Sequence, residues 1–223
     1  MSTRERAFAN GEFYHIYNRG VDKRTIFSDS YDLHRFFKSM IEFNTEAPIG
    51  SLYEKSFHQL GGRTAKSDSQ ENLVSVVAYC LNPNHFHFIL KQTREGGVSE
   101  FMKRLSGGYT WYFNNKYKRS GSLFQGKFKS VYIDTNEYLL HVSAYVNLND
   151  RVHQLGGPTA KLVDSKSSWE EYMDGNVRGI CEKEIISEQF NNANEYEQFA
   201  LNSLESIRER KEELRDIASL LLE

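Results

Sequence analysis

One stretch restricts the fold more than any other, because it predicts two strands joined by a tight turn. Residues 71–80 (ENLVSVVAYC) are rich in β-branched side chains, and in residues 85–91 (HFHFILK) histidines alternate with bulky apolar residues. The Asn-Pro-Asn run between them is typical of a turn, because proline fixes φ and asparagine tolerates tight conformations. We therefore expect a β-hairpin with His85 and His87 on one face of its second arm.

Periodic polarity elsewhere predicts a chain that mixes helices and strands. Alternation at 13–20 predicts a strand that runs into a turn, and 122–133 is typical of a strand that carries basic residues. Helical spacing of apolar residues occurs in three segments, at 30–43, 98–121 and 134–150. A charged helical tail is expected from about Cys181 onwards.

Local residue choices predict how two of these helices begin and how the third one packs. Ser30 is the expected N-cap of the first helix, and Asp134 with Glu137 has capping-box spacing at the start of the last. Gly107 and Gly108 lie inside the middle helix, where each costs about 1 kcal/mol relative to alanine. Such a pair is more often a close-packing contact than a ligand site.

The formal net charge of −2 conceals an uneven distribution. Residues 101–133 include seven lysines and arginines and no acidic residue, whereas in residues 181–223 eleven acidic residues outnumber five basic ones. Because the distribution of charge sets local affinity for phosphate, the small net charge does not exclude a nucleic-acid binder.

Other sequence features point away from membranes and secretion. No stretch approaches the roughly 18 consecutive apolar residues of a membrane span. The first residues are charged and lack the apolar core of a signal peptide. Cys80 and Cys181 lie far apart and form neither a zinc spacing nor a disulfide framework. We expect a cytoplasmic protein with no membrane partner.

The two histidines of the hairpin are candidate metal ligands. Their alternation places them on one side of a strand with Cβ atoms roughly 7 Å apart, close enough to share a divalent ion. The bland alternative is a polar, solvent-facing edge of the strand. A third ligand nearby would favour the metal site over this alternative.

Tyr145 and Asn149 are candidates to complete such a site. They are four residues apart and therefore lie on one helix face. The Asn149 amide oxygen is a suitable ligand for Mg²⁺ or Mn²⁺, and the ion would act as a Lewis acid on a phosphodiester. The Tyr145 phenol would attack the phosphorus and form a covalent 5′-phosphotyrosine. The alternatives are that Tyr145 is a core residue, one of thirteen tyrosines, or that Tyr138 is the nucleophile.

Basic and aromatic residues interleave in the cationic segment, a composition that suits single-stranded nucleic acid. The alternative is that the aromatic residues form core and the lysines a solvated face. The candidate contacts to the DNA backbone are Arg19, Lys116, Lys118, Arg119, Lys127 and Lys129. His15 and His141 are expected to be structural.

Four segments follow one another along the chain: FYHIYNRG, CLNPNHFHFIL, GSLFQGKF and EYLLHVSAYVNLN. Their motifs, in this order, resemble those of the Y1 HUH-type transposases of the IS200/IS605-like group, most closely the REP-associated tyrosine transposases. The resemblance implies an α+β fold, with a ferredoxin-like or RRM-like antiparallel sheet, helices on one face and a helical C-terminal appendage. It divides the chain into a transposase domain at 8–150, a connecting segment at 151–180 and the charged tail at 181–223.

The resemblance also implies roles for individual residues. His85 and His87 match the metal motif, Tyr145 matches the nucleophile and Asn149 the third ligand, with Mg²⁺ or Mn²⁺ as cofactor. The family usually has proline where this chain has Asp150. The implied partner is hairpin-forming single-stranded DNA, which is cut and rejoined by a monomer or a homodimer. The alternatives are a non-catalytic RRM-like nucleic-acid-binding module and a metal-dependent hydrolase.

A nine-residue sequence occurs twice, as HQLGGRTAK at 58–66 and HQLGGPTAK at 153–161. The flanking sequences are unrelated, so the repeat is not a duplicated structural unit. We expect two surface loops, or alternatively two in-frame insertions of one short mobile DNA repeat, which loops tolerate at small cost.

Overall fold

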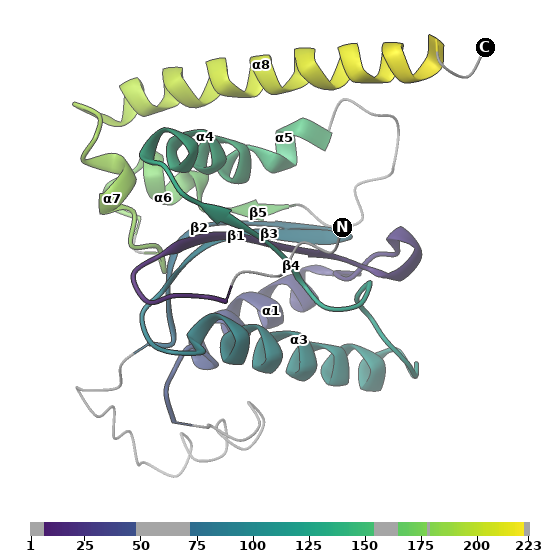
Figure 1. Ribbon diagram of the computed structural model, residues 1–223. Helices are drawn as coiled ribbons and strands as arrows, with labels where there is room; N and C mark the ends of the chain where they lie inside the picture. Colours follow the sequence, from purple (N-terminus) through teal and green to yellow (C-terminus); the bar gives the residue numbers. More distant parts are fainter. Residues whose placement is uncertain (1–6, 48–71, 154–164, 178, 221–223) are drawn as a thin grey trace.

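The computed structural model describes residues 7–47, 72–153, 165–177 and 179–220 (Figure 1). In this part of the chain, an antiparallel five-stranded sheet has the order β4-β1-β3-β2-β5. The strands are β1 (Phe13–Arg19), β2 (Val74–Asn82), β3 (His85–Gln92), β4 (Lys129–Ile133) and β5 (Lys166–Ser167). The predicted hairpin is therefore formed by β2 and β3.

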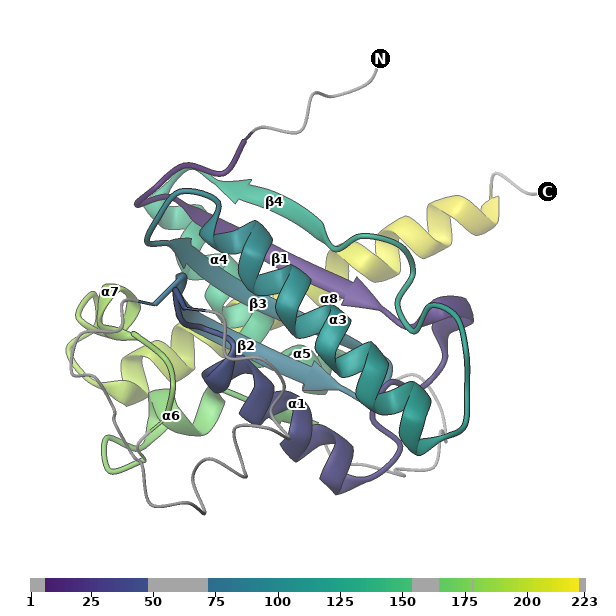
Figure 2. The same ribbon diagram turned by 90° about the horizontal axis from the view of Figure 1, so that it is seen from below.

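Helices lie on both faces of the sheet. Figures 1 and 2 show α1 (Ser30–Glu42) and α3 (Gly97–Lys116) on one face, and α4 (Asn136–Asn147) and α8 (Ala193–Leu220) on the other. The shorter helices are η1 (Val21–Lys23), α5 (Asn149–His153), α6 (Trp169–Met173) and α7 (Glu184–Ser187). The order β1-α1-β2-β3-α3-β4, with these strands arranged 4-1-3-2, is the ferredoxin-like arrangement. The predicted α+β class is confirmed.

The two layers of helices explain the burial of the central strands. Every residue of β2 is buried, as expected for a strand with both faces covered. On β3, Phe86 and Phe88 point toward α1 and α3 and pack with Phe36, whereas Ile89 joins the apolar cluster under α4. Alternation along the strand thus directs the two phenylalanines and the two histidines to opposite faces of the sheet.

The sequence predicted α4 as the helix that carries Tyr145 and α8 as part of a charged tail, but not that the two helices form a layer on the sheet. α8 is charged overall, but one side of it is buried through Tyr196, Ala200 and Leu204. The segment predicted as a connection also contains β5, which extends the sheet, and α6. The C-terminal residues therefore complete the core on the face that carries the histidines.

Several boundaries differ from the sequence prediction. Asp29 rather than Ser30 caps α1, because its Oδ1 accepts the backbone N–H of Asp32 at 2.8 Å. Thr135 rather than Asp134 caps α4, with its Oγ1 accepting from the N–H of Tyr138 at 3.1 Å. In both cases two adjacent polar residues competed for the cap position, and the choice was wrong by one residue.

Two elements are shorter than predicted. α3 ends at Lys116 and is followed by a turn in which Lys118 has a φ of 52°. β4 begins at Lys129, and Gly121 and Gly126 before it have φ of 83° and 72°, which interrupts the predicted strand. The repeated sequences at 58–66 and 153–161 lie outside the described residues, apart from His153, which ends α5.

None of the described helices is both long enough and apolar enough to cross a membrane.

The two glycines of α3 offer a matched stability test. A Cβ on Gly108 would lie 2.9–3.0 Å from the ring of the buried Phe43, whereas a Cβ on Gly107 would meet nothing within 4 Å. We expect Gly107→Ala to raise the free energy of unfolding by about 0.5–1 kcal/mol through helix propensity. Gly108→Ala should be about 1–3 kcal/mol less stable than Gly107→Ala because of overpacking. Urea denaturation measures both, and equal stabilities would contradict the packing described here.

Candidate active site

Strand pairing brings residues of three strands onto one face of the sheet. β1 pairs with β3, which places Tyr17 opposite His87 and Arg19 opposite His85. β1 also pairs with β4, which places Lys129 on the other side of Tyr17. Because directly paired residues of antiparallel strands point to the same face, all of these side chains are neighbours.

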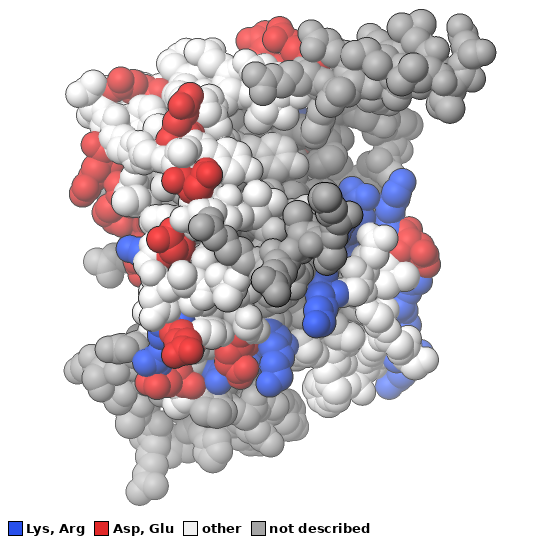
Figure 3. All heavy atoms as spheres, viewed as in Figure 1, with Lys and Arg blue, Asp and Glu red and all other residues white. Residues whose placement is uncertain are grey.

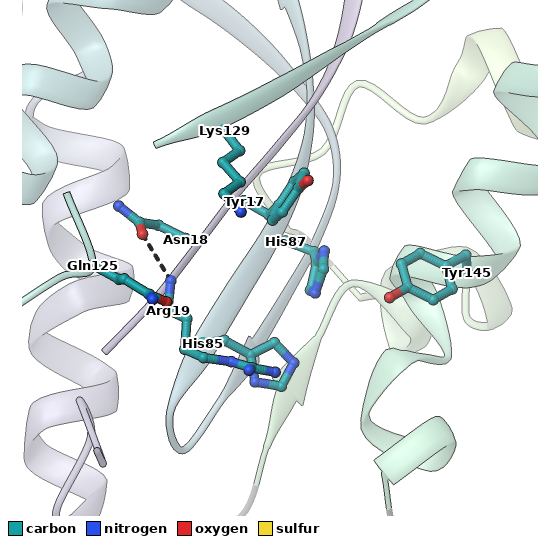
Figure 4. Close-up of a pocket in the computed structure, with 8 residues that line it drawn as sticks. All are labelled: Tyr17, Asn18, Arg19, His85, His87, Gln125, Lys129 and Tyr145. Atoms are coloured by element: carbon teal, nitrogen blue, oxygen red, sulfur yellow. Dashed lines mark hydrogen bonds between the residues drawn. The ribbon is translucent and has the colours of Figure 1, made fainter. Parts of the chain in front are cut away.

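A cavity of about 340 Å³ opens over these residues (Figure 4). Its lining residues are Tyr17, Asn18, Arg19, His85, His87, Gln125, Lys129 and Tyr145. The volume falls within the range of small-ligand sites, about 300–1,000 Å³. The cavity joins the predicted histidine pair, the predicted tyrosine and two of the predicted cations.

One ring nitrogen of His85 faces an amide oxygen. Nδ1 of His85 lies 2.6 Å from Oδ1 of Asn84, which is an acceptor, so Nδ1 carries the hydrogen. Nε2 lies 3.1 Å from Oδ1 of Asn149, and Nδ2 of Asn82 is 3.0 Å from Nε2 and 2.9 Å from that oxygen. In a neutral imidazole, Nε2 and the Asn149 oxygen are thus two acceptors directed at one region.

This convergence fits a small divalent cation. Neighbouring ligands in octahedral coordination at about 2.1 Å lie about 3.0 Å apart, close to the His85–Asn149 separation of 3.1 Å. Both side chains are buried. Among the described residues, no group of three or more His, Cys, Asp or Glu side chains could hold a metal ion.

His15 orients the ring of His87. Nε2 of His15 lies 2.9 Å from Nδ1 of His87, and the rings stack with centroids 5.1 Å apart. Burial lowers the pKa of His15 to about 4, so its ring is neutral at pH 7. When this Nε2 accepts, His87 carries its hydrogen on Nδ1 and a lone pair on Nε2, which is the form that binds a metal.

Tyr145 approaches the histidines from α4. Its ring meets His87 and His15 edge-on, with centroids 5.4 Å and 6.0 Å away, and Figure 4 shows its hydroxyl turned toward the histidine pair. Burial raises the pKa of the phenol, while a hydrogen bond with the Asn149 side chain acts in the opposite direction. The phenol is therefore protonated at neutral pH and needs nearby positive charge to become a nucleophile.

Asn149 reaches the site although Asp150 replaces the family's proline. α4 ends at Asn147, Leu148 is its C-cap, and α5 begins at Asn149. The break in the helix thus forms without proline and keeps Asn149 buried beside His85. Oδ1 of Asp150 is buried without a hydrogen-bond partner among the described residues.

A buried polar network fixes α4 to the C-terminal elements. Nδ2 of Asn147 donates to the hydroxyl of Tyr196 at 2.8 Å, and Oγ of Ser168 donates to Oδ1 of Asn147 at 2.5 Å. Oγ of Ser143 contacts the same tyrosine hydroxyl at 3.1 Å. Oγ of Ser168 also accepts from the backbone N–H of Tyr79 on β2, at 2.9 Å. The network therefore sets the position of the tyrosine helix relative to the sheet.

The rival residues of the sequence analysis lie elsewhere. Tyr138 is 38% exposed and does not line the cavity, unlike Tyr145. Nδ1 of His141 contacts Oγ of Ser203, and its ring packs on Phe199, so it joins α4 to α8. The geometry favours Tyr145 as the candidate nucleophile.

The six predicted DNA contacts separate into groups. Arg19 and Lys129 line the cavity, and Lys127 is exposed just before β4. Lys118 is exposed beyond the end of α3, next to the half-buried Arg119. Nζ of Lys116, in contrast, lies 2.7 Å from a carboxylate oxygen of Asp29 and of Asp32.

Residues 53–149 match the family model described as "Transposase IS200 like". Over this segment the chain resembles the IS200-like transposases. The segment contains β2, β3, α3, β4 and α4, and with them His85, His87 and Tyr145. The resemblance inferred from the sequence motifs is confirmed.

Two further comparisons complete the picture. No curated protein matches the chain. One similar solved structure is described as "Structure of the REP associates tyrosine transposase bound to a REP hairpin", with 14% identity, a TM-score of 0.48, and coverage of 81% of this chain and 90% of that chain. The resemblance of the segment to the IS200-like transposases rests on the family model and not on this similarity.

The sequence analysis missed several residues of the site. Tyr17, Asn18 and Gln125 line the cavity, and Asn82 holds the Asn149 oxygen. Tyr17 shares the alternation of β1 with His15, which would have placed both on the histidine face once the β1–β3 pairing was known. Gln125 lies outside any strand, so no periodicity indicated it.

Removal of one hydroxyl tests the network under α4. Tyr196→Phe should lower the free energy of unfolding by about 1–3 kcal/mol, because it leaves Nδ2 of the buried Asn147 without its acceptor. Tyr138→Phe, at an exposed position of the same layer, is the control and should change it by less than about 0.5 kcal/mol. Chemical denaturation compares the two, and equal effects would argue against the network.

Proposed function

We propose that this protein is a transposase that cuts and rejoins hairpin-forming single-stranded DNA through Tyr145, with Mg²⁺ or Mn²⁺ held by His85, His87 and Asn149. The observation that carries the proposal is the meeting of α4 with β3. The Tyr145 ring lies 5.4 Å from His87, while the Asn149 oxygen lies 3.1 Å from His85. The match of residues 53–149 to the IS200-like transposase model supports the same chemistry.

The protein's own residues would prepare the reacting groups. Asn84 and His15 hold the rings of His85 and His87, so that Nε2 of each is left with a lone pair. When bound there, a divalent cation supplies Lewis-acid polarisation of the phosphodiester and positive charge near the phenol. Asn149 contacts both His85 and the Tyr145 phenol, and thereby couples the ligand set to the nucleophile.

The chemical step would be an exchange of phosphodiester bonds. Oη of Tyr145 attacks the phosphorus, the bond from phosphorus to the 3′ oxygen breaks, and the phenolic proton is balanced by protonation of the leaving 3′-OH. A 5′-phosphotyrosine remains, which conserves the energy of the bond. Attack by the 3′-OH of another strand then releases Tyr145 and rejoins the DNA.

The DNA backbone would follow the basic edge of the molecule. Figure 3 shows lysine and arginine side chains gathered, with a few acidic ones, where β1 ends and β4 begins, and acidic side chains on the opposite edge around α7. Arg19 and Lys129 lie at the cavity, and Lys127, Lys118 and Arg119 extend the charge along this side. Lys116 is the least suited of the six, because Asp29 and Asp32 neutralise it.

Replacement of the proposed nucleophile gives the first test. Wild-type protein incubated with hairpin-forming DNA and Mn²⁺ should give a protein–DNA adduct on a denaturing gel. Tyr145→Phe should reduce it about 10³-fold or more, because it removes the phenol that would attack the phosphorus. Tyr138→Phe should keep it. Hairpin binding without an adduct in wild type would favour the non-catalytic binding module, and cleavage that persists in Tyr145→Phe would favour a hydrolase.

Replacement of either histidine should separate binding from cleavage. His85→Ala and His87→Ala are each expected to lower cleavage by about 10³-fold or more while the dissociation constant for hairpin DNA changes less than about threefold, since the basic contacts stay in place. His141→Ala, outside the cavity, is the control for loss of a histidine. A loss of hairpin binding in both variants would mean that the pair is structural.

A further inference from the structure

We propose that Tyr17 and Gln125 form a nucleobase subsite beside the catalytic residues, in which Tyr17 stacks on one unpaired base of the DNA and Gln125 hydrogen-bonds to its edge. The subsite rests on the proposed function only in that a single strand would occupy the cavity. It adds a determinant of base preference to a site that otherwise contacts phosphates.

Tyr17 is held as a rigid aromatic surface. Its ring stacks on His15, with centroids 5.1 Å apart and planes at 28°, and on His87, at 5.6 Å and 18°. The side chain is half-buried and lines the cavity, and its hydroxyl has no hydrogen-bond partner among the described residues.

Gln125 has a fixed backbone and an available amide. Its N–H donates to the carbonyl of Arg19 at 2.8 Å, and Nδ2 of Asn18 donates to the carbonyl of Gly126 at 3.2 Å. Phe124, just before it, is buried and bridges to Gly20. The side chain of Gln125 is exposed and lines the cavity, and its amide makes no hydrogen bond to any other described residue.

An unpaired base matches these two side chains chemically. A base offers a π-face for Tyr17 and, along one edge, neighbouring donors and acceptors that an amide can pair with. Arg19 lies two residues after Tyr17 on β1, and Lys129 lies beside Tyr17 on β4, so cations flank the ring as phosphates flank a base. A base in a duplex has no free face, so the subsite selects single strands.

The position of the subsite sets the register of the strand. Tyr17 stacks on His87, the proposed metal ligand, and Tyr145 meets that ring from another direction. A base on Tyr17 therefore belongs to a nucleotide close to the scissile phosphate. The cavity, at about 340 Å³, has room for such a nucleotide.

Equilibrium binding without divalent cation tests the subsite independently of cleavage. The probes are fluorescent single strands dA12, dC12 and dT12 in EDTA, with the full chain. Wild type should bind the three with unequal affinity. Tyr17→Leu should weaken binding of the strand that wild type prefers by about tenfold, because one base–aromatic stack is lost. Tyr17→Phe should bind that strand as tightly as wild type does. Tyr31→Leu, a 63% exposed tyrosine on α1, should leave all three affinities unchanged.

The Gln125 variant separates recognition from folding. Gln125→Ala removes an exposed side chain, so its thermal unfolding should match wild type while its affinities for the three strands become equal. Unchanged base preference in Gln125→Ala, or unchanged affinity in Tyr17→Leu, would overturn the subsite. If Gln125→Ala loses base preference but wild type forms no adduct with DNA, the subsite is supported and the strand-transfer proposal is contradicted.

Discussion

The approach of Asn149 to His85 is the interaction on which the site depends. It brings together His85 on β3 and Asn149 at the start of α5, which are 64 residues apart in the sequence, with 3.1 Å between the two acceptor atoms. Two acceptors that converge in a buried place repel each other unless a proton or a cation lies between them. Here Nδ2 of Asn82 lies within hydrogen-bond distance of both acceptors, while Asn84 takes the hydrogen of the other ring nitrogen of His85.

The fold supports this contact from both sides. The ferredoxin-like half, with α1 and α3 on one face, fixes the strand register that sets the histidines beside Tyr17 and Arg19. The C-terminal elements fix the other partner, because Ser168 and Tyr196 hold Asn147 at the end of α4. Residues 165–204 lie outside the matched transposase segment, yet they determine where the tyrosine helix lies.

Local signals in the sequence were sufficient for the hairpin and for the candidate residues on it. Alternation with a period of two, interrupted by a proline turn, predicted β2, β3 and the shared face of His85 and His87. The spacing of Tyr145 and Asn149 predicted that both approach one place, which the cavity and the His85 contact now support geometrically. The assignment of catalytic and ligand roles to these residues stays a prediction.

Interactions between distant parts of the chain account for what the sequence did not reveal. His15 contacts His87 across 72 residues, and Gln125 lies in a loop between two glycines with positive φ, Gly121 and Gly126. Lys116 belongs to a basic run, but Asp29 and Asp32, more than 80 residues earlier, neutralise it. Such pairings depend on the tertiary fold, so neither composition nor periodicity can predict them.

Pulsed electron paramagnetic resonance of bound Mn²⁺ tests the central claim most directly. The account predicts hyperfine coupling to two imidazole nitrogens in the wild-type protein, reduced to one in His85→Ala and in His87→Ala, and unchanged in His141→Ala. A wild-type spectrum without imidazole coupling would contradict it. So would one in which neither alanine variant at β3 alters the coupling.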